Sequence, residues 1–111
     1  MDKIEQYQIY IQELLEDYAN FGQAEDEVET ELIFDTQRHH YQIMNVGWQD
    51  EHRLYGCVLH INIKNSKIWI QHNGTEISIA SELVAKGVPK EDIVLGFHSP
   101  YKRQFTEFAV N

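Results

Sequence analysis

A near-continuous series of β-strand patterns between Tyr41 and Glu76 is the feature that most constrains what this chain can fold into. A period of two residues is typical of a β-strand with one buried face. The strongest run extends from Arg53 to Lys64, and its positions on one side are Tyr55, Cys57, Leu59, Ile61 and Ile63. A second run, Lys67 to Asn73, follows after only Asn65 and Ser66. Because asparagine tolerates a positive φ, these two residues suit a tight hairpin turn.

The turn also predicts the register of the hairpin. We expect Lys64 opposite Lys67, so that apolar residues pair on one face and a mixed set pairs on the other. The expected core pairs are Ile63–Ile68, Ile61–Ile70 and Leu59–His72, and the expected pairs on the second face are Asn62–Trp69 and His60–Gln71. A slip of one residue would move the apolar set to the opposite face, so burial favours this register.

A preceding strand, about Tyr41 to Trp48, extends the predicted sheet. With Trp48 opposite Arg53, the core face receives Met44–Cys57 and Val46–Tyr55, and the second face receives Tyr41–His60 and Ile43–Val58. The second face is therefore half-apolar, and it holds Tyr41, Ile43, Val58, His60 and Trp69. Such a face on a small domain contacts a helix of the same chain, a second subunit or another protein. We treat these five residues as a candidate interface and expect a homo-oligomer.

Helical spacing precedes this sheet. Apolar residues recur every three or four positions, at Ile4, Tyr7, Ile11, Leu14, Leu15, Tyr18 and Phe21. Asp2 suits the N-terminal cap of this helix, and Gly22 suits its end. A polar connection, Gln23 to Glu29, then leads to a predicted first strand at Thr30 to Asp35.

A second helix is expected after the sheet, from a cap at Thr75 to about Lys86. Ile93 to Phe97 is expected to form a short strand or extended segment, and the apolar residues of Ser99 to Asn111 predict a tail that packs down. The predicted fold class is α+β. It comprises a meander-like antiparallel sheet of four or five strands, with the N-terminal helix and the second helix packed on it.

Charge is concentrated at the start of the chain. Residues 1–31 contain ten acidic residues and one basic residue, whereas residues 32–111 contain eight of each, so the first segment carries the whole net charge of −9. Nucleic-acid binding depends on Lys and Arg that neutralise phosphates, so direct DNA binding is not expected. The acidic segment predicts either a solubilising surface or a docking surface for a basic partner. Its candidate contact residues are Glu13, Glu16 and Asp17.

Length and cysteine content bound the remaining possibilities. We interpret residues 1–111 as a single domain that is large enough to bury a core. No segment approaches the roughly 20 apolar residues of a membrane span, and the first residues do not resemble a secretory signal. A lone Cys57 cannot form an internal disulfide. These features favour a cytoplasmic location.

Candidate catalytic and metal-binding groups are sparse. None of the six histidines forms the i, i+4 pair of a zinc protease, and no second cysteine supports a structural zinc site. Cys57 lies among apolar strand residues, which argues against a reactive thiolate. No glycine-rich phosphate loop is present. We therefore predict no catalytic residue, no cofactor and no metal. A small hydrolase or ligand-binding domain with a pocket around His60 or His98 remains an alternative.

Fragments spread along almost the whole chain resemble the XisI family, the fdxN-element excision controlling factors of filamentous cyanobacteria. Each fragment is weak alone, but their order and spacing are specific. The early fragments are Tyr7, Ile11, Leu14-Leu15, Tyr18, Phe34-Asp35, His40-Tyr41-Gln42 and Gly47-Trp48. The central fragments are Arg53-Leu54-Tyr55-Gly56-Cys57-Val58-Leu59-His60-Ile61, Lys67-Ile68-Trp69-Ile70-Gln71 and Thr75-Glu76. The late fragments are Leu83-Val84, Gly87-Val88-Pro89-Lys90, Asp92-Ile93-Val94-Leu95-Gly96-Phe97-His98, Arg103 and Phe108-Ala109.

The resemblance implies a regulatory, non-enzymatic protein. The founding member acts with a companion, XisH, in developmental excision of a DNA element, while a separate recombinase performs the chemistry. No catalytic site is assigned to the family, so none is carried over to this chain. Because the companion resembles restriction-type nucleases, an immunity-type inhibitor of a XisH-like nuclease is the alternative function.

Overall fold

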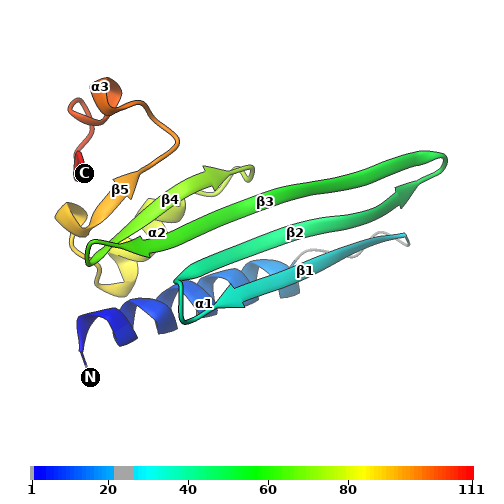
Figure 1. Cartoon of the computed structure of the whole chain (residues 1–111), viewed down its shortest axis with the longest axis horizontal. Coiled ribbons are helices and arrows are strands. Elements are labelled where there is room, and N and C mark those ends of the chain that lie inside the picture. Colours follow the sequence, from blue (N-terminus) through cyan, green and yellow to red (C-terminus); the bar gives the residue numbers. More distant parts are fainter. Residues whose placement is uncertain (1, 22–26) are drawn as a thin grey trace.

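The alternating stretch forms the centre of a five-stranded sheet with the order β1-β2-β3-β4-β5 (Figure 1). The computed structural model describes residues 2–21 and 27–111. The helices are α1 (Lys3–Phe21), α2 (Ile79–Lys86) and α3 (Pro100–Arg103), with a short 3₁₀ turn, η1, at Lys90–Asp92. The strands are β1 (Val28–Asp35), β2 (His40–Gln49), β3 (His52–Lys64), β4 (Lys67–Asn73) and β5 (Ile93–Leu95). The predicted α+β class is confirmed.

The apolar stripe of α1 packs on the sheet, as its spacing predicts. Asp2 caps the helix, because its Oδ1 accepts a hydrogen bond of 2.9 Å from the backbone N–H of Glu5. The buried residues of the stripe are Tyr7, Ile11, Leu14 and Leu15, which join a core built from the sheet and α2. Gly22 and most of the predicted Gln23–Glu29 connection, like the side chain of Phe21, lie outside the described residues. Glu29 itself belongs to β1.

The β3–β4 hairpin has the predicted turn. Asn65 and Ser66 have φ values of 54° and 62°, and a turn with two positive φ angles matches the twist of its flanking strands. The register from Lys64–Lys67 to Ile61–Ile70 is confirmed. Beyond it, Gln71 forms a bulge and the pairing shifts by one residue. The pairs are His60–His72 and Leu59–Asn73, so the predicted Leu59–His72 and His60–Gln71 pairs are wrong.

A second bulge, at Val58, divides β3 into two halves. The predicted pairs Trp48–Arg53, Val46–Tyr55 and Met44–Cys57 are confirmed. After the bulge the pairs are Ile43–Leu59 and Tyr41–Ile61, instead of the predicted Ile43–Val58 and Tyr41–His60. The extra residue reverses the alternation of side chains between the two faces.

The bulge exchanges the residues that line the core. Tyr41 and Ile43 are completely buried, so their predicted place on the second face is wrong. Tyr55 and Cys57 do not line the core as predicted, because they face the other side of the sheet from Leu59. Tyr55 is 69% exposed, and Cys57 is half-buried.

The C-terminal part completes the sheet. Ser78, not the predicted Thr75, caps α2, and Gly87 ends this helix with a φ of 113°. β5 is parallel to β4, so the sheet is a meander only through its first four strands. The tail packs down as predicted, since Ala109 bridges Val94 and Phe108 packs against the core.

Across residues 2–21 and 27–111, no helix is both long and apolar enough to cross a membrane.

Candidate functional site

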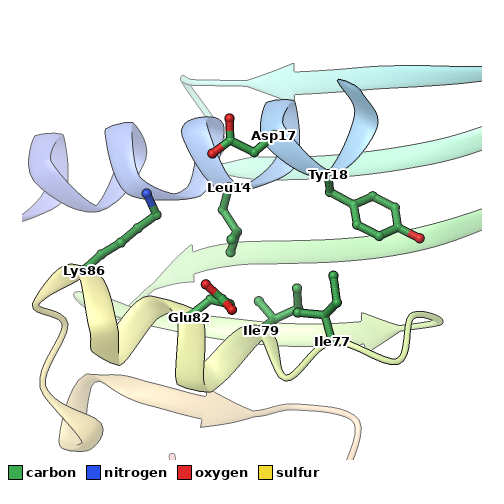
Figure 2. A pocket seen from close by; sticks show the side chains of 7 residues that line it. All are labelled: Leu14, Asp17, Tyr18, Ile77, Ile79, Glu82 and Lys86. Carbon is green, nitrogen blue, oxygen red and sulfur yellow. The ribbon is translucent and has the colours of Figure 1, made fainter. Parts of the chain in front are cut away.

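A groove of about 560 Å³ lies between α1 and α2 (Figure 2). Its lining comes from the second half of α1, from one side of α2 along the whole helix, and from the residue before the α2 cap. The lining residues are Leu14, Asp17, Tyr18, Ile77, Ile79, Glu82 and Lys86. Figure 2 shows Leu14 from one helix and Ile79 from the other pointing into the space between them. The groove therefore has an apolar floor and charged edges.

Ile77 is the exposed apolar wall of this groove, and polar contacts hold its backbone in place. Its N–H donates a hydrogen bond of 3.1 Å to the Thr75 hydroxyl, and its carbonyl accepts one of 2.8 Å from Asn73 Nδ2. The side chain is nevertheless 42% exposed. A fixed backbone under an exposed isoleucine makes a preformed apolar contact point.

The charged edges are mostly acidic. Glu13 accepts a salt bridge of 3.3 Å from Lys86, which links α1 and α2 at one end of the groove. Of the four salt bridges found among the described residues, none involves Glu16, Asp17 or Glu82. The last turn of α1 contains no basic residue. Acidic side chains near the negative end of a helix dipole are unfavourable, so a cation from outside would stabilise this end of α1.

The face predicted as an interface does not assemble as expected. Tyr41 and Ile43 belong to the core, and Val58 is half-buried against it. Trp69 is only 7% exposed because the tail of the same chain covers it. The guanidinium of Arg103 lies 5.2 Å from its ring centroid. Of the five residues, His60 alone retains neighbours that suggest a polar site.

The two bulges bring three histidines together. His60 pairs with His72 across the sheet, and its Nε2 lies 3.5 Å from Nδ1 of His40. Asn62 Nδ2 lies 2.5 Å from the same His40 nitrogen. Burial lowers the pKa of His60, and electrostatic interaction with the neighbouring imidazoles of His40 and His72 lowers it further. The sequence-derived register missed this cluster because it placed His60 and His72 on opposite faces.

The remaining candidate groups do not form a reactive site. Burial raises the pKa of the Cys57 thiol, which donates a hydrogen bond of 3.2 Å to the Leu59 carbonyl. The ring of His98 packs against Phe97, with the centroids 4.5 Å apart. Within the described part of the chain, no three His, Cys, Asp or Glu side chains gather closely enough to hold a metal ion.

Glu13, Glu16 and Asp17 lie exposed on α1, where the sequence places them. The sequence did not indicate the groove beside them, because it depends on how far apart two helices pack. One feature of the sequence could have indicated the groove. Ile77 is an apolar residue outside the buried stripe of α2, next to its cap.

The XisI protein family matches residues 1–110. The chain belongs to the XisI family. Solved members share its architecture closely. A XisI-like protein from Anabaena variabilis ATCC 29413 is 51% identical, with a TM-score of 0.94 over 97% of this chain and 99% of the other. The fdxN element excision controlling factor XisI from the same organism is 39% identical, with a TM-score of 0.89 over 99% of this chain and 100% of the other. Among curated proteins, no sequence matches the chain.

Proposed function

We propose that this XisI-family protein is a non-enzymatic accessory factor, which controls excision of a DNA element in the cytoplasm by binding a XisH-like protein. The observation that carries the proposal is the acidic surface of α1, formed by Glu13, Glu16 and Asp17 beside the apolar groove. A solved relative is an excision controlling factor, which favours a role of the same kind.

The charge distribution supports a protein partner more than a nucleic acid. A surface with exposed Glu16 and Asp17 repels phosphates, whereas it attracts a basic protein and accelerates the encounter. The apolar groove next to these acids adds area that excludes water, and charged contacts gain strength near such area. The combination suits a partner with a basic rim and apolar anchors.

Co-purification with a XisH-like protein tests the proposal. The wild-type chain should retain the partner at low salt and release it as salt screens the charges. Glu16→Lys with Asp17→Lys should weaken retention roughly tenfold or more. A matched control with the same change in net charge is Glu29→Lys with Glu51→Lys, at exposed positions outside α1. Absence of retention by the wild-type chain would contradict the proposed function.

A second function is favoured by the same acidic surface. Carboxylates spaced along α1 present negative charge as a phosphate backbone does, so they would occupy a basic nucleic-acid channel. In that case the protein inhibits a nuclease-like XisH partner. Rescue of growth when both proteins are produced together would favour the inhibitor, and unchanged toxicity would count against it.

A further inference from the structure

We propose that the groove between α1 and α2 receives residues 100–105 of a second copy of this chain, here called the α3 segment, in a reciprocal two-fold dimer. In each contact, the Tyr101 and Phe105 rings of one copy enter the apolar groove of the other. Lys102 of the entering segment faces Asp17 and Glu82 on the edge of the groove. This inference goes beyond the proposed function, and because both proposals use the groove, the second copy and a XisH-like partner would compete for it.

The entering segment presents two aromatic rings to solvent. Tyr101 and Phe105 are each 71% exposed, and their rings pack edge to face with centroids 5.3 Å apart. Aromatic pairs add attraction beyond their buried area, so the contact between the two rings helps to hold their relative orientation. Tyrosine is also one of the residue types that contribute most of the binding energy at interfaces.

The fold anchors this segment firmly while leaving the rings outside. Arg103 Nε donates a hydrogen bond of 3.0 Å to the His98 carbonyl, and its guanidinium lies over the buried Trp69 ring. Ser99 caps α3 by accepting a hydrogen bond from the N–H of Lys102. An anchored segment loses little conformational freedom when it binds, which lowers the cost of association. Holding two aromatic rings exposed to water is unfavourable unless another surface covers them.

Charge and surface type match between the two elements. The groove is apolar, and its edge carries Asp17 and Glu82, while its one lysine, Lys86, is paired with Glu13. The α3 segment is aromatic with adjacent basic residues, Lys102 and Arg103. Lys102 is exposed and adds positive charge where the end of α1 lacks any. In contrast, α1 of a second copy would bring like charges together at Glu16 and Asp17. The observations therefore favour α3 as the occupant.

The size of the contact favours a reciprocal arrangement. Burying the two rings removes on the order of 300 Å² from water, and the groove contributes about as much, so one contact covers roughly 600 Å². That is the size of a non-specific contact, whereas two reciprocal contacts reach about 1,200 Å², the lower limit of specific interfaces. A two-fold dimer also closes, while a single head-to-tail contact continues into chains.

Sedimentation and light scattering of the full chain over a wide concentration range test the dimer. The wild-type chain should form a reversible dimer. Ile77→Lys, which places a cation in the groove, and Tyr101→Ser with Phe105→Ser should each raise the dimer dissociation constant roughly tenfold or more. Ile33→Lys is the matched control, because Ile33 is 44% exposed on the edge strand β1, compared with 42% for Ile77. It should dimerise like the wild type.

A charge exchange tests the orientation. Lys102→Glu should weaken the dimer, and adding Glu82→Lys to the same chain should restore it, because both contacts regain opposite charges. Thermal unfolding checks that each variant is folded, and all these positions are solvent-exposed. A monomer at every concentration would overturn the proposal. So would a dimer that is unaffected by Ile77→Lys, or a double variant that is weaker than Lys102→Glu alone.

Discussion

Tyr7 and Asp92 join the first helix to the C-terminal part of the chain, through a hydrogen bond of 2.5 Å from the tyrosine hydroxyl to Oδ2. Lys3 Nζ lies 2.9 Å from the same oxygen. Burial alone would raise the pKa of Asp92, but the hydrogen bonds from Lys3 and Tyr7 lower it below its ordinary value. The carboxylate in η1 is therefore stabilised by two side chains of α1, an element that is distant in the sequence.

Tyr7→Phe should lower the free energy of unfolding by about 1–3 kcal/mol, because it removes a donor from a partly buried carboxylate. Urea denaturation measures the change. Tyr10→Phe is the matched control on the same helix, since no hydrogen bond from the Tyr10 hydroxyl is found among the described residues. Equal losses in both variants would mean that the Asp92 contact contributes little.

His60→Gln should remove part of the dependence of stability on pH. The pKa of His60 is lowered in the folded state, so the unfolded chain binds a proton first as the pH falls. Stability is therefore fully present above about pH 6.5 and decreases as the pH falls towards the pKa of the folded state. Asn62 and two further histidines, His40 and His72, surround the group.

Urea midpoints at pH values above and below this range measure the effect of His60→Gln. The variant should lose less stability on acidification than the wild type. His52→Gln, at the exposed end of the β2–β3 hairpin, should behave like the wild type. A wild-type midpoint that does not change with pH would contradict the assignment.

Gly47→Ala should destabilise the fold, whereas Gly56→Ala should not. A Cβ at Gly47 would overlap the Glu27 carbonyl oxygen and lie 2.6 Å from Val28 Cα, so the start of β1 must shift, at a cost of about 1–3 kcal/mol. A Cβ at Gly56 meets nothing within 4 Å, and alanine there should stabilise by about 0.4–1 kcal/mol by restricting the unfolded chain. Thermal unfolding of both variants decides between overlap and a general effect of glycine in strands.

Cys57 should react slowly with a thiol reagent in the native protein. Burial raises the pKa of its thiol, so the reactive thiolate is scarce at neutral pH. Absorbance after addition of a disulfide reagent should rise quickly only when urea is present. A fast reaction of the folded protein would identify an accessible thiolate and would reopen the possibility of a nucleophile.

The sequence predicted the elements of this fold much better than it predicted their faces. Alternation and turn residues located β2, β3 and β4, and the Asn65-Ser66 turn set a register that holds to Ile61–Ile70. Beyond the turn, pairing depends on two single-residue bulges, which leave no sign in a pattern of apolar and polar residues. Tyr41 and Ile43, which were assigned to the wrong face, lie beyond the bulge at Val58. Trp69 keeps its predicted pairing with Asn62 and is buried for a different reason, the tail that covers it.

The candidate site depends on tertiary distances that no local pattern encodes. The acidic residues of α1 were predicted from composition alone, and the structure adds the groove beside them. Two helices that pack on one sheet leave a gap whose width is set by side chains from both, such as Leu14 and Ile79. The aromatic pair of the α3 segment was not predicted for the same reason. The sequence does not show whether the side chains of Tyr101 and Phe105 are exposed or buried in the fold.

The bulge at Val58 places the two halves of β3 under different constraints on substitution. The side chains of Tyr55 and Cys57 must suit the outer surface of the hairpin, whereas those of Leu59, Ile61 and Ile63 must fit the buried core. Removing that one residue would bring both halves into phase and would turn the aromatic end of the hairpin inside out. An insertion or deletion at Val58 should therefore destabilise the fold more than a substitution of a neighbouring side chain. Related chains should preserve the length of this strand more strictly than its composition.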